Sequence, residues 1–115
     1  MESNQTQRVV LTNAFALSMF GNPNLISVEF RRITLQQLRE IAKNAVIVNY
    51  IRHPSTVNIV AQALGRQLEP NSGIYSYSQG DIVVIVTLAQ PQRGQEIQAQ
   101  PEDLILYQLT VRELA

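Results

Sequence analysis

The run DIVVIVTLA, residues 81–89, is the most apolar stretch of the chain and constrains its fold more than any other segment. Gln79-Gly80 precedes it and Pro91 follows it closely, so turn-forming residues bound the run on both sides. A continuous, bounded run of β-branched residues is typical of a strand buried on both faces. We therefore predict that residues 81–89 form the central strand of a sheet, which ends in a loop at Pro91-Gln92-Arg93-Gly94.

Other segments have strand patterns of their own. Apolar and polar side chains alternate along residues 25–33, which predicts a strand that buries Ile26, Val28 and Phe30 and exposes its other face to solvent. Residues 45–51 (AVIVNYI) are continuously apolar up to Asn49, as expected for an interior strand. The remaining predicted strands are residues 8–12 at the start of the sheet, a short edge strand at residues 74–77, and a final strand at residues 106–114.

Two helices are predicted from their end signals and their apolar spacing. Thr34 and Gln37 have the form of a capping box, in which each side chain satisfies a free backbone amide at a helix start. Pro54 suits the first position of a second helix, and Gly65 supplies its C-terminal stop. The buried stripes are Leu35, Leu38, Ile41, Ala42 and Ala45 in the first helix, and Val57, Val60, Ala61 and Leu64 in the second.

Two further segments, residues 13–20 and the start at Pro101, are expected to form short helical turns. The predicted fold class is α/β (α+β), with a mixed sheet of about five strands flanked by two or three helices. We expect one domain over residues 1–115, with residues 1–7 as a flexible polar leader that has no signal-peptide pattern.

Composition excludes several classes of function. A net charge of zero disfavours DNA as a partner, and no segment approaches the roughly 18 apolar residues that span a membrane. Because the chain has no cysteine, disulfides, thiolate zinc sites and thiol nucleophiles are excluded together. We expect a protein of the cytoplasm, of the cell or of an infected host, that needs no cofactor.

The run VNYIRHPSTVNIVAQALG, residues 48–65, contains the single histidine, His53, between a predicted strand and a predicted helix. A helix N-terminus attracts phosphate, because its free amides and the helix dipole favour negative charge. Ser55 and Thr56 add hydroxyl groups, and a histidine at that position can protonate a leaving oxygen. The arrangement suits metal-independent phosphodiester cleavage. The alternative is structural: Ser55 and Thr56 cap the helix, and His53 is a partly buried junction residue.

Other hydrolytic chemistries have less support. Asp81, Glu102 and Asp103 have no metal-ligand spacing relative to His53, and there is no second histidine. A Ser-His-Asp triad has no supporting nucleophile motif. The sequence therefore predicts no metal site.

Two stretches, VVLTNAFALSMF (residues 9–20) and IRHPSTVNIVAQALG (residues 51–65), resemble a known family when taken together. The family is that of the small viral ring nucleases that act as type III anti-CRISPR proteins, first known from archaeal viruses and since found in phages and bacterial genomes. Its marks are a first strand running into Asn-Ala-Phe, a His-x-Ser-Thr junction that opens a helix, and a late apolar strand that ends in a loop with glycine. Here these are Asn13-Ala14-Phe15, His53-Pro54-Ser55-Thr56 and residues 81–94.

The resemblance implies a homodimer whose subunits form a pocket for cyclic oligoadenylate, namely the cyclic tetra-adenylate messenger of type III CRISPR defence. Family members cut it without metal: a ribose 2′-hydroxyl attacks the adjacent phosphate, the histidine protonates the departing 5′-oxygen, and the products carry a 2′,3′-cyclic phosphate. His53 takes the catalytic role by this resemblance. The implied substrate-binding residues are Asn13, Ala14, Phe15, Ser55, Thr56, Gln90 and Arg93.

Three positions depart from the family pattern. Ala16 stands where a serine often follows Asn-Ala-Phe. The family's late loop carries an arginine and a glutamate before its glycine, whereas Gln90 and Arg93 precede Gly94 here, with Glu96 as a substitute acid. These departures are compatible with slow turnover or with binding without cleavage. Two alternatives therefore stay open: a dimer that sequesters cyclic nucleotides without cutting them, and an interaction module of mobile-element origin.

Overall fold

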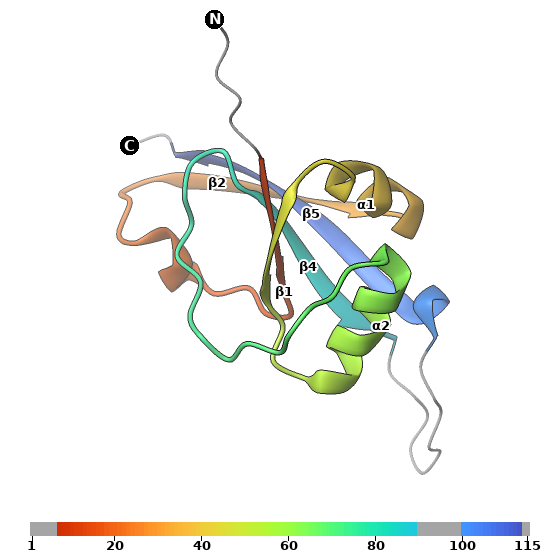
Figure 1. Ribbon diagram of the computed structural model, residues 1–115. Helices are drawn as coiled ribbons and strands as arrows, with labels where there is room; N and C mark the ends of the chain where they lie inside the picture. The colour runs from red at the N-terminus through yellow and green to blue at the C-terminus, as the bar shows by residue number, and fades with distance from the viewer. Residues whose placement is uncertain (1–6, 90–99, 114–115) are drawn as a thin grey trace, which may run out of the picture.

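The computed structural model describes residues 7–89 and 100–113, which form one five-stranded mixed sheet with two α-helices (Figure 1). The strand order is β2-β5-β4-β1-β3. The predicted α+β class is confirmed. The strands are β1 Arg8–Thr12, β2 Ile26–Ile33, β3 Val46–Tyr50, β4 Ile82–Leu88 and β5 Leu104–Glu113.

Strand β4 is the middle strand of the sheet, as its apolar run predicted. It pairs parallel with β1 and antiparallel with β5, and residues 83–86 are buried. The interior position predicted for residues 45–51 is wrong, because β3 is an edge strand that pairs only with β1. Its outer side is covered by the segment after α2, where the Asn71 amide donates to the Ile51 carbonyl (2.9 Å). A shielded edge strand can carry the same apolar run as an interior one.

Helices α1 (Leu35–Ala42) and α2 (Pro54–Leu64) both pack on one face of the sheet (Figure 1). The predicted capping box is present: Gln37 N donates to Thr34 Oγ1 at 3.1 Å, and Thr34 N donates to Gln37 Oε1 at 2.8 Å. Gly65 ends α2 in the left-handed conformation, with φ 65°. The main core under these helices contains Val9, Leu11, Ile33, Leu38, Ala45, Ile51, Val57, Val60, Val84, Val86, Leu104 and Leu106.

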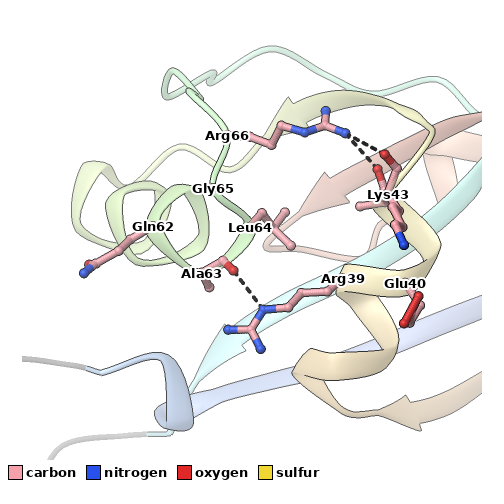
Figure 2. Close-up of a pocket in the computed structure, with 9 residues that line it drawn as sticks. Arg39, Glu40, Lys43, Gln62, Ala63, Leu64, Gly65 and Arg66 are labelled. Carbon is pink, nitrogen blue, oxygen red and sulfur yellow. Dashed lines mark hydrogen bonds between the residues drawn. The ribbon is translucent and has the colours of Figure 1, made fainter.

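Two arginines join the C-terminal ends of the helices to each other (Figure 2). Arg39 Nε, on α1, donates to the Ala63 carbonyl in the last turn of α2 at 3.0 Å. Arg66 Nη2, just after α2, donates to the Ala42 carbonyl at the end of α1 at 2.9 Å. Each cation thus satisfies a carbonyl at the negative end of the other helix dipole.

The opposite face of the sheet carries a smaller core without an α-helix. It is covered by the 3₁₀ turn η1 (Leu17–Phe20) and by the chain between α2 and β4. The edge strand predicted at residues 74–77 is wrong: this segment has no strand pairing, although the Tyr77 amide donates to the Met19 carbonyl (2.8 Å). The members of this second core are Val10, Met19, Tyr75, Val83, Ile85 and Leu109.

The predicted burial of one face of β2 is wrong in part. Ile26 and Val28 are half-buried, but Phe30 is 49% exposed. Because both helices lie on the other face, they do not cover Phe30, which packs against Phe15 with a distance of 5.1 Å between the ring centroids. The short turn predicted at Pro101 is confirmed as η2 (Pro101–Asp103).

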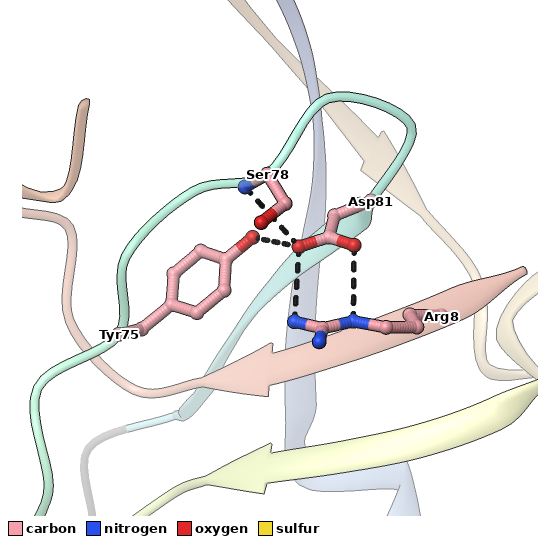
Figure 3. Close-up of polar contacts among 4 residues, drawn as sticks. All are labelled: Arg8, Tyr75, Ser78 and Asp81. Carbon is pink, nitrogen blue, oxygen red and sulfur yellow. Dashed lines mark hydrogen bonds and ion pairs between the residues drawn. The ribbon is translucent and has the colours of Figure 1, made fainter.

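A cluster of polar side chains links the residue before β4 to the first residue of β1 by hydrogen bonds and an ion pair (Figure 3). Asp81 accepts from Arg8 Nη2 at 3.2 Å, from the Tyr75 hydroxyl, and from the Ser78 amide at 3.4 Å. Burial, followed by the hydrogen bond to Asp81, raises the pKa of the Tyr75 hydroxyl well above its usual value. None of the helices in the described part of the chain has the length and apolar character needed to cross a membrane.

Candidate functional site

The carboxyl ends of two parallel strands, β1 and β3, lie side by side at one edge of the sheet, next to the middle of β4. Thr12, the last residue of β1, pairs with Tyr50 at the end of β3 on one side and with Ile85 of β4 on the other. The chain leaves this edge through Asn13 after β1 and through His53 after β3. Open sheets with parallel strands bind ligands outside such carboxyl ends. The topology thus brings together two segments that lie far apart in the sequence.

His53 stands at the junction that the sequence predicted, as the N-cap residue of α2. Its backbone is extended (φ −81°, ψ 119°), and its carbonyl accepts from the Val57 amide at 3.0 Å. Its side chain is exposed and makes no capping hydrogen bond within residues 7–89 and 100–113, so the imidazole is accessible to a ligand. Pro54 occupies the first turn, and no acidic residue lies there to oppose an anion.

The alternative in which Ser55 and Thr56 cap the helix is wrong. Both residues lie inside the first turn of α2, beyond the N-cap, and His53 is exposed instead of partly buried. Ser55 is exposed at the same edge as His53, whereas Thr56 is only 7% exposed. Ser55 is therefore the hydroxyl of this turn that a ligand can reach most directly.

The Asn13-Ala14-Phe15 segment is held in place on both sides of Asn13. Thr12 Oγ1 donates to the Ala14 carbonyl at 3.2 Å and accepts from the Ala14 amide at 3.4 Å. The Phe15 ring packs against Phe20 and Phe30, with centroids 5.8 and 5.1 Å away. Thr12 and Phe15 thus fix the path of the loop and leave Asn13, which is half-buried, at the carboxyl edge.

Two asparagines that the sequence analysis missed anchor the approach to His53. Asn49 Nδ2 donates to the Glu69 carbonyl at 2.7 Å, and Asn49 Oδ1 accepts from the Ile51 amide at 3.2 Å. Asn71 Nδ2 donates to the Asn49 carbonyl at 3.1 Å. These bonds tie the chain after α2 to the end of β3. A polar residue inside the apolar run AVIVNYI was the sequence signal for this anchor.

Ala16, the first of the three departures noted in the sequence, is the N-cap residue of η1 and is exposed. Its carbonyl accepts from the Met19 amide at 3.1 Å, so Ala16 stabilises the turn η1 through its backbone and not through its side chain. The predicted residues Gln90 and Arg93, and the substitute acid Glu96, lie outside the described residues. Within residues 7–89 and 100–113, no group of three or more His, Asp or Glu side chains is placed to hold a metal ion.

Comparison with known proteins gave a family and a fold. The model of the STIV B116-like family matches residues 9–111. Among solved structures, the fold is similar to that of B116 of Sulfolobus turreted icosahedral virus, with a TM-score of 0.63 and 22% sequence identity. That match covers 89% of this chain and 97% of the viral chain. None of the curated proteins matches this chain.

Proposed function

Because this chain belongs to the STIV B116-like family, we propose that it is a metal-independent ring nuclease that cleaves cyclic oligoadenylate. The observation that carries the proposal is the position of His53: an exposed imidazole at the N-terminus of α2, at the edge where β1 and β3 both end. The resemblance of the Asn-Ala-Phe and His-x-Ser-Thr segments to viral ring nucleases supplies the substrate, cyclic tetra-adenylate.

The proposed reaction needs one proton donor and a site that holds the phosphate. The ribose 2′-hydroxyl loses its proton to solvent and attacks the adjacent phosphorus, and the bond from phosphorus to the 5′-oxygen breaks. His53 gives its proton to that oxygen, so the ring opens to a linear chain with a 5′-hydroxyl at one end and a 2′,3′-cyclic phosphate at the other. General acid catalysis of this kind contributes roughly 10²- to 10⁴-fold to a rate.

The phosphate-binding part of the proposal is supported by the first turn of α2. Pro54 has no amide hydrogen, so the free donors of this turn are the backbone amides and hydroxyls of Ser55 and Thr56. Asn13 reaches the same edge from β1 and can donate through its side-chain amide. A homodimer is part of this proposal, because a ring-shaped ligand with repeated phosphates matches two identical sets of these donors.

The test is incubation with cyclic tetra-adenylate in EDTA, with products identified by mass spectrometry. His53→Asn is the central variant, because asparagine is a good N-cap residue and keeps the start of α2 while it removes the proton donor. Arg52→Gln is the matched control, since it removes a charge from the adjacent exposed position. We expect linear products with a 2′,3′-cyclic phosphate from the wild type and from Arg52→Gln, and a loss of at least a hundredfold in His53→Asn.

A substrate with sulfur in place of the 5′-bridging oxygen tests the role of His53 as an acid. A thiolate leaves without protonation, so His53→Asn should cleave this substrate nearly as fast as the wild type does. Equal loss on both substrates would show that His53 does not act as a general acid.

Two other outcomes would support the alternatives. Tight binding without any product, together with sedimentation as a dimer, would favour a protein that sequesters cyclic nucleotides. Absence of binding would favour an interaction module and would reject the proposal altogether.

A further inference from the structure

The two edges of the sheet differ in how they are covered. The outer side of β3 is bonded to the chain after α2, where Asn71 donates to the Ile51 and Asn49 carbonyls. Strand β2, at the opposite edge (Figure 1), pairs with β5 alone, and in the described part of the chain its backbone makes no other hydrogen bond. Its eight residues pair with β5 without a bulge, so the free side is long and regular. Such an edge presents unpaired amides and carbonyls that a further strand can pair with.

The charges of β2 favour a second copy of the same strand as the partner. Glu29 and Arg31 are two residues apart, so both project from the same face of the sheet, and both are exposed. In the described ranges the one ion pair is Arg8–Asp81, so neither residue has an opposite charge within ion-pair distance in its own protomer. An antiparallel pair of β2 strands with its two-fold axis at Phe30 places Glu29 opposite the partner's Arg31, and it does so twice. The strand is therefore complementary in charge to itself.

The neighbouring registers of the same pair are opposed by charge. In a continuous sheet, residues that lie opposite each other project from the same face, so the two-fold axis falls on a residue position. An axis at Glu29 would place the two Glu29 carboxylates opposite each other, and an axis at Arg31 would do the same with two guanidinium groups. Like charges directly opposite each other destabilise a strand pair. The axis at Phe30 lies between these two positions and replaces both repulsions by attraction.

Phe30 provides the apolar contact of this register. It projects from the opposite face, and its side chain is 49% exposed although Phe15 packs against it. At the two-fold axis the two Phe30 side chains lie directly opposite each other, with Cβ atoms about 4.5–5.5 Å apart. Aromatic pairs at such positions stabilise strand pairing, and the contact removes exposed ring surface from water. The exposed phenylalanine in the middle of an edge strand thus has a structural role.

We propose that β2 pairs antiparallel with β2 of a second copy of this chain through residues 27–33. The two five-stranded sheets then join into one continuous sheet, with the α-helices of both copies on the same face. Because β2 and β3 are opposite edges of the sheet, this interface shares no strand with the edge where β1 and β3 end. It does not rest on the proposed nuclease function, and it is additional to the dimer contact which that function needs.

Charge exchange tests the pairing, with sedimentation equilibrium of the full chain as the assay. Arg31→Glu and Glu29→Arg each place like charges opposite one another at two positions, so each should weaken association roughly tenfold or more. The double variant exchanges the charges and restores both attractive pairs, so it should associate nearly as the wild type does. Arg112→Glu is the matched control, because this exposed residue pairs with Ser27 from the adjacent strand β5, on the same face, and should leave association unchanged. Circular dichroism verifies that each variant is folded.

Cross-linking tests the register. The chain has no cysteine, so the one thiol of Phe30→Cys can form a disulfide with another copy alone. Directly opposite residues have Cα atoms about 4.5–5.5 Å apart, which suits a disulfide, and we expect a covalent dimer on oxidation. Arg32→Cys is the control: on the same face of β2, its two thiols would be four residues out of register, about 13 Å apart, and should not cross-link.

Three results would overturn the proposal. The first is a wild type that sediments as a monomer even at millimolar concentration. The second is an oligomer whose mass is the same in Arg31→Glu as in the wild type, which would place the contact between copies elsewhere. The third is a double variant that associates as weakly as the single variants, or a disulfide that forms in Arg32→Cys as readily as in Phe30→Cys.

Discussion

Asp81→Asn should destabilise the protein strongly, although the substitution replaces only one carboxylate oxygen by an amide group. The Asp81 side chain is 5% exposed and accepts hydrogen bonds from three partners, Arg8, Tyr75 and Ser78. A hydrogen bond to a charged group contributes about 1.5–3 kcal/mol, and removal of one member of a buried pair costs about 3–5 kcal/mol. Asparagine keeps one acceptor oxygen, and Arg8 is 44% exposed, so water compensates part of the loss. We expect a decrease of about 2–3 kcal/mol in the free energy of unfolding.

The assay is urea unfolding at pH 7, with the midpoint and the slope both fitted. Two comparisons separate the causes. Arg8→Gln should cost about 1–2 kcal/mol, less than Asp81→Asn, because the Asp81 carboxylate loses its cation but keeps the hydrogen bonds from Tyr75 and Ser78. Glu102→Gln, at an exposed carboxylate, should change nothing measurable. A loss under about 0.5 kcal/mol in Asp81→Asn would refute the reasoning, and a loss in Arg8→Gln as large as that in Asp81→Asn would show that the ion pair is the main contribution.

Three other predictions concern single residues. The pKa of Tyr75 is raised in the folded state, so its contribution to the free energy of unfolding is fully present below pH 10. Above pH 10 the free energy of unfolding should fall by up to about 1.4 kcal/mol per pH unit. Urea unfolding of Tyr75→Phe should show no such decrease with pH. Thr12→Val should weaken cyclic tetra-adenylate binding in a titration, whereas Thr12→Ser should not, because only the hydroxyl holds Ala14. Gly65→Ala should cost about 1–2 kcal/mol in urea unfolding, and Gly65→Asn less, because φ is 65° and no atom lies within 4 Å of an added Cβ.

Local chemistry made several elements of the fold predictable. The capping box at Thr34 and the stop at Gly65 each depend on residues within one helical turn, and both are present. The central position of β4 followed from an apolar run that needs burial on both faces. In each case the information lies within the segment itself.

Contacts between distant segments were not predictable in the same way. β3 has the composition of an interior strand, but its outer side is covered by a loop some twenty residues later, through Asn71. The exposure of Phe30 follows from the placement of both helices on the other face. An alternating pattern shows that a strand has two different faces, but it does not show how completely the apolar face is covered.

The residues of the candidate site also fall into those that local sequence patterns predict and those that depend on contacts between distant segments. The position of His53 at a helix start was a local inference and is confirmed. The proximity of Asn13 required the parallel pairing of β1 with β3, which sequence patterns did not give. Thr12, with its hydroxyl bonded to the loop, was missed because a threonine at the end of a strand has no distinctive pattern.

This division between exposed and anchoring residues determines which variants can test the proposed function. His53 and Ser55 are exposed and make no contact on which the core depends, so their substitution should alter chemistry or binding while the free energy of unfolding stays nearly constant. Asn49 and Thr12 are bonded to backbone groups of the loops that carry the site, so their substitution should lower stability and binding together. A loss of cleavage in a Thr12 or Asn49 variant therefore says little about mechanism. The same loss in a fully stable His53→Asn variant assigns the proton transfer to His53 when the substrate with a 5′-bridging sulfur is still cleaved.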